Sequence, residues 1–180
     1  MTAATDALVI RDASPADVPA ITAIYGHHVR HGLASFEETP PDEDEIARRF
    51  ADVAAKGYPY LVAAPGAGGA VLGYAYASAY RPRPAYRWTV ENSVYLAPAS
   101  ARRGIGAALL AALIARCEAK GFRQMVAVIG DSANDASIGL HERLGFVRAG
   151  LIRSVGYKHG RWVDSVLMQR ALGAGDSTHP

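Results

Sequence analysis

The stretch that decides the fold is Val94-Tyr95-Leu96-Ala97-Pro98-Ala99-Ser100-Ala101-Arg102-Arg103-Gly104-Ile105-Gly106. An apolar strand pattern ends here, a short loop follows, and a helix begins on two glycines. Glycines allow the backbone to approach a ligand closely, and the free N–H groups of a first helical turn favour an anion. Arg102 and Arg103 add positive charge. The stretch therefore predicts a pyrophosphate cradle, although a plain glycine-tolerant helix start with solvated arginines is an alternative.

Elements predicted on both sides of this stretch form a mixed α/β pattern. The strand Trp88–Leu96, the helix Ile105–Lys120 and the strand Phe122–Ile129 make a central β-α-β unit, and Ile105, Leu109, Leu113 and Cys117 share one helix stripe. Three other helices are predicted. One begins at Ser14-Pro15, one runs from Asp42 to Lys56, and one spans Asn134–Leu144. The remaining predicted strands are Leu8–Arg11, Tyr60–Ala64, Val71–Tyr80, Ile152–Tyr157 and Trp162–Arg170.

Composition excludes several classes of protein. The 180 residues suit one domain, with an ordered core over 7–172 and short flexible ends. A net charge of +2 is too small to indicate a nucleic-acid partner, and no apolar run is long enough for a bilayer. The single cysteine, Cys117, cannot form an internal disulfide, and Met1–Asp6 has no signal-peptide pattern. We expect a cytoplasmic protein without a membrane partner.

The glycine pattern does not favour a dinucleotide site. A third small residue is expected after Gly104 and Gly106, but Leu109 occupies that position. The acidic residue that would bind a ribose is also missing from the end of the next strand, since Asp131 lies further out. A nucleotide-dependent oxidoreductase is therefore disfavoured.

Two motifs resemble those of the GNAT superfamily of N-acetyltransferases. Arg102-Arg103-Gly104-Ile105-Gly106, followed by Ala107-Ala108-Leu109-Leu110, resembles its acyl-CoA motif, and Asn134, Ser137, His141, Gly145 and Phe146 have the spacing of its second motif. Four further stretches make the resemblance narrower: Ala34–Glu37, Thr89–Tyr95, Leu140–Phe146 and Gly160–Trp162. They are similar to the phosphinothricin and methionine sulfoximine N-acetyltransferases, and the resemblance covers Leu8–Leu172. Two positions depart from the superfamily pattern: Ala101 replaces a Gln or Arg, and His141 replaces a tyrosine.

The resemblance implies a fold and a function. The fold would be a mixed, mostly antiparallel twisted sheet flanked by helices around the acyl-CoA-binding β-α-β unit. The function would be acetyl transfer from acetyl-CoA, as co-substrate, to the amino group of a small anionic amino acid, which would confer resistance to phosphinothricin-type herbicides. Two alternatives keep the chemistry but change the acceptor, to another small amine or to a protein N-terminus. A third alternative is a module that binds CoA without catalysis.

The resemblance also assigns catalytic roles. Acetyl transfer to an amine needs a base for the amine and an acid for the departing thiolate. Glu91 shares a strand face with Ser93 and Tyr95 and is the predicted base, directly or through water; a surface carboxylate is the alternative. His141 is the predicted acid, with a buried structural histidine as the alternative.

The predicted binding residues fall into two sets. Those that would hold acetyl-CoA are Val94, Tyr95, Leu96, Arg102, Arg103, Gly104, Ile105, Gly106, Ala107, Asn134 and Ser137. Those that would hold the amino acid are Phe36, Arg81, Arg83 and Tyr86, because an arginine fork suits carboxylate and phosphinate oxygens. No metal site is predicted, since His27 and His31 lack further ligands. Tyr157 and Trp162 are candidates for a homodimer contact, with core packing as the alternative.

Overall fold

The computed structural model describes residues 7–66 and 68–180, so the prediction for Met1–Asp6 lies outside the described residues. Its strands form one seven-stranded sheet in the order β1-β2-β3-β4-β5-β7-β6. Only the pair β4–β5 is parallel among these neighbours in the described sheet. The strands are β1 (Leu8–Asp12), β2 (Tyr60–Pro65), β3 (Gly73–Ala79), β4 (Thr89–Leu96), β5 (Gln124–Gly130), β6 (Val147–Lys158) and β7 (Arg161–Ala171). The predicted mixed, mostly antiparallel sheet is confirmed.

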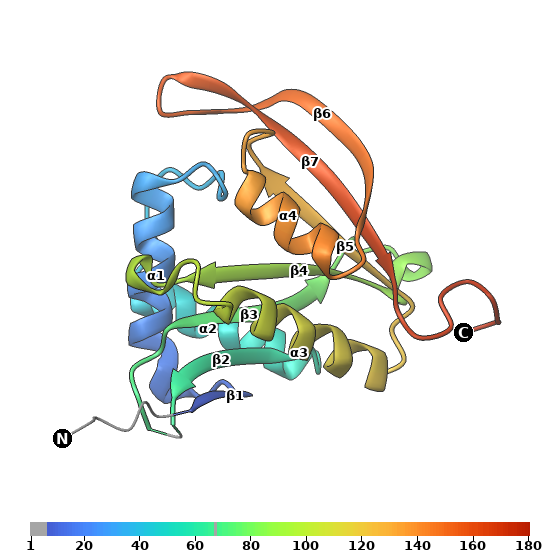
Figure 1. Ribbon diagram of the computed structural model, residues 1–180, viewed down its shortest axis with the longest axis horizontal. Coiled ribbons are helices and arrows are strands. Elements are labelled where there is room, and N and C mark those ends of the chain that lie inside the picture. Colours follow the sequence, from blue (N-terminus) through green and yellow to red (C-terminus); the bar gives the residue numbers. More distant parts are fainter. Residues whose placement is uncertain (1–6, 67) are drawn as a thin grey trace.

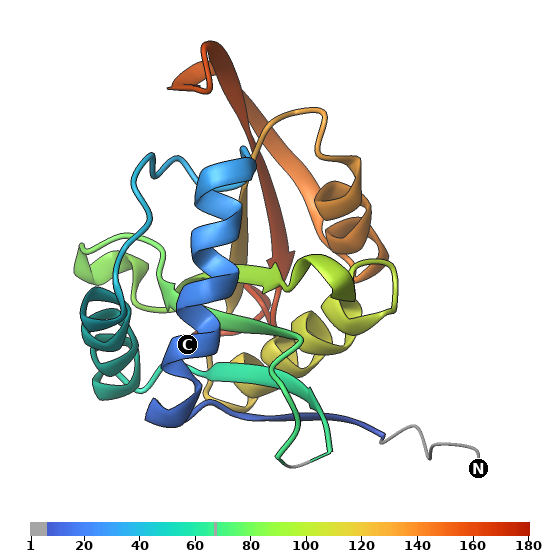
Figure 2. The same ribbon diagram turned by 90° about the vertical axis from the view of Figure 1, so that its left-hand side faces the viewer.

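Helices cover both faces of the sheet (Figures 1 and 2). They are α1 (Val18–His31), α2 (Glu43–Ala55), α3 (Ile105–Ala119) and α4 (Asp135–Arg143), with short 3-10 turns at Pro15–Asp17, Pro84–Tyr86 and Pro98–Ser100. Helices α1 and α2 pack on one face through a cluster that includes Ile21, Ile46 and Tyr74. Helix α3 packs on the opposite face through Leu109, Leu113 and their neighbours, and α4 joins it through Ile138.

Local signals in the sequence explain where several helices begin and end. Asp42 caps α2 by accepting a 2.8 Å hydrogen bond from the Glu45 N–H, and Gly57 follows the helix at φ +75°. The predicted start at Ser14 differs in detail, because a 3-10 turn comes first and α1 begins at Val18. Asp17 closes that turn by accepting from the Ser14 backbone N–H at 2.8 Å.

The parallel pair β4–β5 comes apart along its length. The two strands pair from Thr89 opposite Gln124 to Asn92 opposite Ala127, and the described ladder between them ends there. Strand β4 continues to Leu96 and β5 to Gly130 without further pairing to each other. The sheet therefore opens at the carboxyl ends of β4 and β5, which is the usual place for a ligand beside parallel strands.

The hairpin of β6 and β7 projects beyond the rest of the sheet (Figure 1). Strand β6 begins at Val147, five residues before the predicted start, because Arg148 and Gly150 interrupt the apolar alternation that the prediction relied on. Its register with β7 shifts twice, between Arg148 and Gly150 and between Ile152 and Gly156. Large apolar side chains remain exposed on this hairpin: Val147, Leu151, Ile152, Val155, Tyr157 and Trp162.

Candidate active site

A cavity of about 460 Å³ lies where β4 and β5 separate. The end of α1, the segment 34–37 that follows it, β3, β4, β5 and α4 all contribute to its walls. Glu91 and Asn92, neighbours on β4, both line it, although alternation directs them to opposite faces of the sheet. The cavity therefore reaches through the opening in the sheet, and we name it the central cavity.

A groove of about 560 Å³ adjoins the central cavity. Val94, Tyr95, Asn134 and Ser137 line both spaces, which places the two next to each other. The groove continues past Leu96, Ala97 and Pro98 to Ala101 and Gly106 at the start of α3. Its length and its end at a helix N-terminus suit a long ligand that carries phosphate.

The start of α3 has the geometry of an anion-binding turn. Gly104 is its N-cap residue at φ +77°, and Arg102 before it also has a positive φ of 61°. A β-carbon at Gly104 would meet nothing within 4 Å, so this glycine is required for its backbone conformation rather than for space. A β-carbon at Gly106 would lie 3.4 Å from Leu140 Cδ2, at the wall of the groove.

Other residues of the predicted cradle have separate positions. Arg102 and Arg103 are exposed, and Arg103 lines a small cavity beside Leu8 and Pro65 rather than the groove. Ile105 is 2% exposed and belongs to the core. Ala107 lies in the first turn of α3 and lines neither main cavity of the described structure. For Ile105 and Ala107 the predicted contact with a ligand is through backbone N–H groups, which this placement allows.

Glu91 presents a carboxylate to the central cavity. It lies opposite Ser78 on β3, is partly buried, and has no side-chain hydrogen bond or ion pair within the described part of the chain. Burial raises its pKa above the ordinary value, and the positive charge of Arg81 partly opposes that rise. A carboxylate with a raised pKa and no fixed partner is suited to accept a proton.

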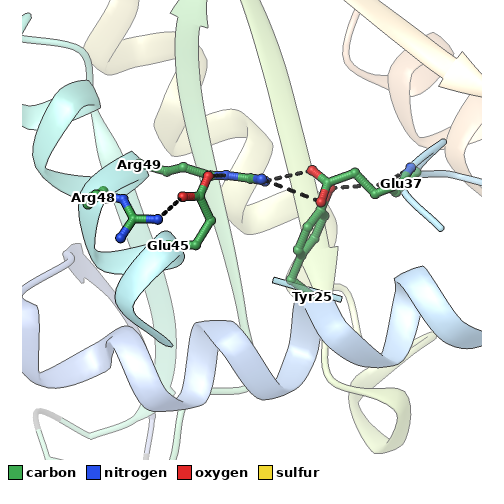
Figure 3. Close-up of polar contacts among 6 residues, drawn as sticks. Tyr25, Glu37, Glu45, Arg48 and Arg49 are labelled. Atoms are coloured by element: carbon green, nitrogen blue, oxygen red, sulfur yellow. Dashed lines mark hydrogen bonds and ion pairs between the residues drawn. The ribbon is translucent and has the colours of Figure 1, made fainter. Parts of the chain in front are cut away.

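A second carboxylate on the cavity wall, Glu37, is fully engaged (Figure 3). Tyr25 donates to Glu37 Oε1 at 2.9 Å, and Arg49 Nη1 donates to the same oxygen at 2.6 Å. Arg49 also donates to Glu45 Oε1 at 2.7 Å, and Glu45 in turn binds Arg48. The two carboxylates therefore differ in their contacts: Glu37 is bonded to Tyr25 and Arg49, whereas Glu91 has no such partner among the described residues.

His141 approaches the central cavity from α4, on the opposite face from Glu91. It is 3% exposed, with Nδ1 2.8 Å from the Ser137 carbonyl and Nε2 3.0 Å from Asn92 Oδ1. Its ring packs edge-on against Phe146 with centroids 4.9 Å apart. Burial lowers the pKa of His141, and the Ser137 carbonyl raises it. Asn134 caps the same helix by accepting from the Ser137 N–H at 3.2 Å.

The predicted substrate residues divide into two places. Phe36 is 41% exposed and lines the central cavity. Arg81, Arg83 and Tyr86 surround a separate hollow formed by their own loop, and this hollow does not include Glu91. The hollow and the central cavity interact electrostatically, because the positive charge of Arg81 lowers the pKa of Glu91.

Several cavity residues were not predicted from the sequence. Tyr25, Ser35, Glu37 and Tyr76 line the central cavity, and so does Asn92, which contacts His141 of α4. Alternation from Glu91 and the pairing of Ser93 with Tyr76 would have indicated the tyrosine. Asn92 was missed because alternation places it on the face away from Glu91, and only the opening of the sheet exposes it to the same cavity.

Metal and thiol chemistry are not indicated. Among the described residues, no group of three or more His, Cys, Asp or Glu could hold a metal ion. Cys117 is fully buried on α3, and burial raises the pKa of its thiol to about 12, which makes it unreactive. No helix in residues 7–66 and 68–180 is long and apolar enough to cross a membrane.

A sheet that opens between two parallel strands, with a groove running to a glycine-capped helix, defines an α/β protein suited to a long ligand that carries phosphate. A family model described as an acetyltransferase (GNAT) domain matches residues 10–167. The chain therefore belongs to the GNAT family of acetyltransferases, and the prediction of that family from the sequence is confirmed.

Relatives with known names and structures extend this result. The chain is 59% identical to phosphinothricin N-acetyltransferase of Alcaligenes faecalis, covering 96% of this chain and 85% of that protein. It is 48% identical to the L-methionine sulfoximine/L-methionine sulfone acetyltransferase of Pseudomonas aeruginosa, covering 91% and 94%. It is also similar to the crystal structure of a GNAT superfamily phosphinothricin acetyltransferase from Sinorhizobium meliloti in complex with acetyl-CoA. That likeness has a TM-score of 0.92 and 53% identity, over 96% of this chain and 92% of the other. The predicted fold and the predicted class of enzyme, an N-acetyltransferase that uses acetyl-CoA, are confirmed.

Proposed function

We propose that this enzyme transfers the acetyl group of acetyl-CoA to the amino group of a small anionic amino acid of the phosphinothricin and methionine sulfoximine type. The observation that carries the proposal is the carboxylate of Glu91, which has no partner among the described residues and lies in a cavity of about 460 Å³ that adjoins the groove leading to α3. Relatives 59% and 48% identical to this chain are named for these two substrates, which supports the substrate class.

The binding of acetyl-CoA follows the groove. Its pyrophosphate would lie at the N-terminus of α3, where the N–H groups after Gly104 point outward and Arg102 adds positive charge. Gly106 leaves room for the adjacent arm, which would pass Asn134 and Ser137. The backbone of Val94–Leu96, unpaired toward β5, would hold the arm and polarise the thioester carbonyl. The Leu96 carbonyl already binds His28 Nε2 at 2.8 Å, and the backbone groups of Tyr95 face Tyr74 of β3, so the backbone of Val94 supplies the free groups.

The chemistry uses the two faces of the opened sheet. Glu91 takes a proton from the substrate ammonium, directly or through one water, and the amine attacks the thioester carbonyl. Collapse of the tetrahedral intermediate breaks the carbon–sulfur bond, and His141 supplies the proton that the thiolate needs. Direct transfer is expected because no activated nucleophile lines the described cavity.

The anionic end of the amino acid is assigned to the loop of Arg81, Arg83 and Tyr86. The described lining of the central cavity contains no Lys or Arg, so an anion bound there needs a cation from outside its wall. Arg81 is the arginine whose charge reaches Glu91. Phe36 would form the apolar wall beside the substrate.

The test is a thiol-release assay with purified enzyme, acetyl-CoA and a panel of amines. We expect kcat/KM for phosphinothricin and methionine sulfoximine to exceed that for a neutral amino acid and for a peptide N-terminus. Acetyl-CoA should raise Tm while NAD does not, because only a ligand that binds the folded state stabilises it. Thiol release with the peptide alone would instead support a protein N-terminus as the substrate. Stabilisation by acetyl-CoA without turnover of any amine would support a binding module.

We further infer a single catalytic domain that acts in the cytoplasm as a homodimer and confers resistance to phosphinothricin. The support for the dimer is the exposed apolar side chains of the β6–β7 hairpin, since Trp162 is 64% and Tyr157 57% exposed. Replacement of Trp162 by Ser should reduce the mass measured by light scattering from two chains to one. An unchanged mass would contradict this assignment.

A further inference from the structure

Asn92 and His141 form a buried pair that the catalytic assignment leaves unexplained. Asn92 is 6% exposed on β4 and His141 is 3% exposed on α4. Asn92 Oδ1 lies 3.0 Å from His141 Nε2, and Asn92 Nδ2 donates to the Val126 carbonyl of β5 at 3.2 Å. The other ring nitrogen, Nδ1, lies 2.8 Å from the Ser137 carbonyl. The pair thus joins β4, β5 and α4 at the wall of the central cavity.

Donor and acceptor chemistry determines the protons on this pair. A carbonyl oxygen can only accept, so the Ser137 carbonyl requires a proton on His141 Nδ1. The Val126 carbonyl likewise requires the NH₂ group of Asn92 on its side, which turns the amide oxygen of Asn92 toward His141. That oxygen also only accepts, so the 3.0 Å contact is a hydrogen bond only when Nε2 carries a proton as well. The surroundings match a ring protonated at both nitrogens.

We propose that Asn92 is a positioning residue that holds His141 as the two-donor imidazolium and thereby prepares it to donate a proton. This inference deepens the proposed function, because it rests on His141 acting as the acid. A neutral His141 would leave the Nε2 lone pair facing the oxygen of Asn92. To relieve that contact, Asn92 would have to rotate its amide and lose its bond to Val126.

The step is balanced in protons and electrons. When the tetrahedral intermediate collapses, the carbon–sulfur bond breaks and its electron pair goes to sulfur. The Nε2 proton of His141 leaves its hydrogen bond to Asn92 Oδ1 and moves to that sulfur, giving the free thiol and a neutral ring that keeps Nδ1–H on Ser137. The amine proton has gone to Glu91 on the other face. Exchange with water then removes that proton from Glu91 and restores the one on His141.

No charged neighbour of the pair substitutes for this role. Glu91 precedes Asn92 on β4, and Glu142 and Arg143 follow His141 on α4; none of them acts on the pKa of His141. The groups facing the ring from the other packed elements are uncharged: Val126 through its carbonyl contact with Asn92, Phe146, and Ser165 of β7 in the cavity wall. Burial lowers the pKa of His141. The Asn92 Oδ1 contact at 3.0 Å opposes that loss, because this oxygen accepts only from a protonated Nε2.

The experiment measures the pKa of His141 by NMR of the ring in the full-length enzyme without substrate. His141→Gln identifies the signal among the six histidines. Asn92→Leu should lower the pKa of His141 by about one to two units, because a hydrogen bond to a charged group is lost. Asn92→Asp, which places a carboxylate at the same position, should raise it. Val90→Ala, a core substitution on the same face of β4, is the matched control and should leave it unchanged.

Two further measurements test the inference. Nitrogen chemical shifts of the neutral ring should show the proton on Nδ1, and kcat in Asn92→Leu should fall with acetyl-CoA binding intact. Equal His141 pKa values in wild type and Asn92→Leu would overturn the inference. If Asn92→Leu does not fold, an unchanged pKa in Asn92→Asp would overturn it equally. Because the NMR measurement needs no substrate, the expected pKa shifts with no turnover of phosphinothricin would refute the proposed function alone.

Discussion

Replacement of Glu91 by Gln tests the proposed base directly. The amide has the shape of the carboxylate but cannot accept a proton from an ammonium group. Loss of a general base lowers kcat by about 10²–10⁴. Since Glu91 has no hydrogen bond or ion pair to lose within the described residues, its replacement should leave Tm and acetyl-CoA binding nearly unchanged.

The raised pKa of Glu91 determines how kcat/KM changes with pH. Burial raises the pKa of Glu91 above its ordinary value of 4.5, and the base is active only when ionised. In wild type, kcat/KM should therefore fall as the pH falls through a midpoint above 4.5. In Glu91→Gln the midpoint of the acid limb should instead move up to the pKa of the substrate amine, because only the free amine then reacts. The deficit should also shrink by about tenfold for each pH unit up to the amine pKa, because hydroxide then supplies the free amine.

The assay is thiol release from acetyl-CoA between pH 5 and 10, with phosphinothricin as the acceptor. The matched control is Glu37→Gln, which changes the other carboxylate of the cavity wall, the one held by Tyr25 and Arg49. This control should keep the acid limb of wild type, whatever its effect on KM. Wild-type turnover at pH 7 in Glu91→Gln, or an acid limb in it with the wild-type midpoint, would refute the reasoning.

Three further predictions concern the cofactor groove, the loop of Arg81 and Arg83, and the segment 34–37. Gly106→Val should raise KM for acetyl-CoA by about ten- to a hundredfold, because the added carbons enter the groove; Gly104→Val should instead lower Tm, since its φ of +77° is strained for a branched residue. Arg83→Ala should lower kcat/KM for phosphinothricin by about ten- to a hundredfold and leave a neutral amine nearly unaffected, and equal losses for both would mean that the loop is structural. Lys158 is 2% exposed and donates to the Ser35 carbonyl at 2.6 Å, so Lys158→Met should raise KM for the amino acid by about fivefold without changing that for acetyl-CoA. Equal changes in the KM values for the amino acid and for acetyl-CoA would contradict a local effect on the segment 34–37.

The sequence by itself determined the central β-α-β unit and the family to which the chain belongs. The residues from Val94 to Gly106 carry a strand end, a turn and a helix start within one local stretch, and such signals depend on neighbours along the chain. Gly104 has a positive φ, which a glycine at this helix start permits, and Asn134 caps its helix by accepting from the Ser137 N–H. The alternation of β4 likewise fixed the face that Glu91 shares with Ser93.

Only the tertiary structure decided which distant residues meet at the opening of the sheet. Pairing between β4 and β5 ends at Asn92 and Ala127, and no local pattern marks that point. Because the strands separate there, Asn92 meets His141 of α4 at the cavity wall, although it faces away from Glu91. The engagement of Glu37 by Arg49 also depends on how α2 packs beside the segment after α1. These contacts join residues far apart in sequence, and their free energy depends on burial and geometry that exist only once the chain has folded.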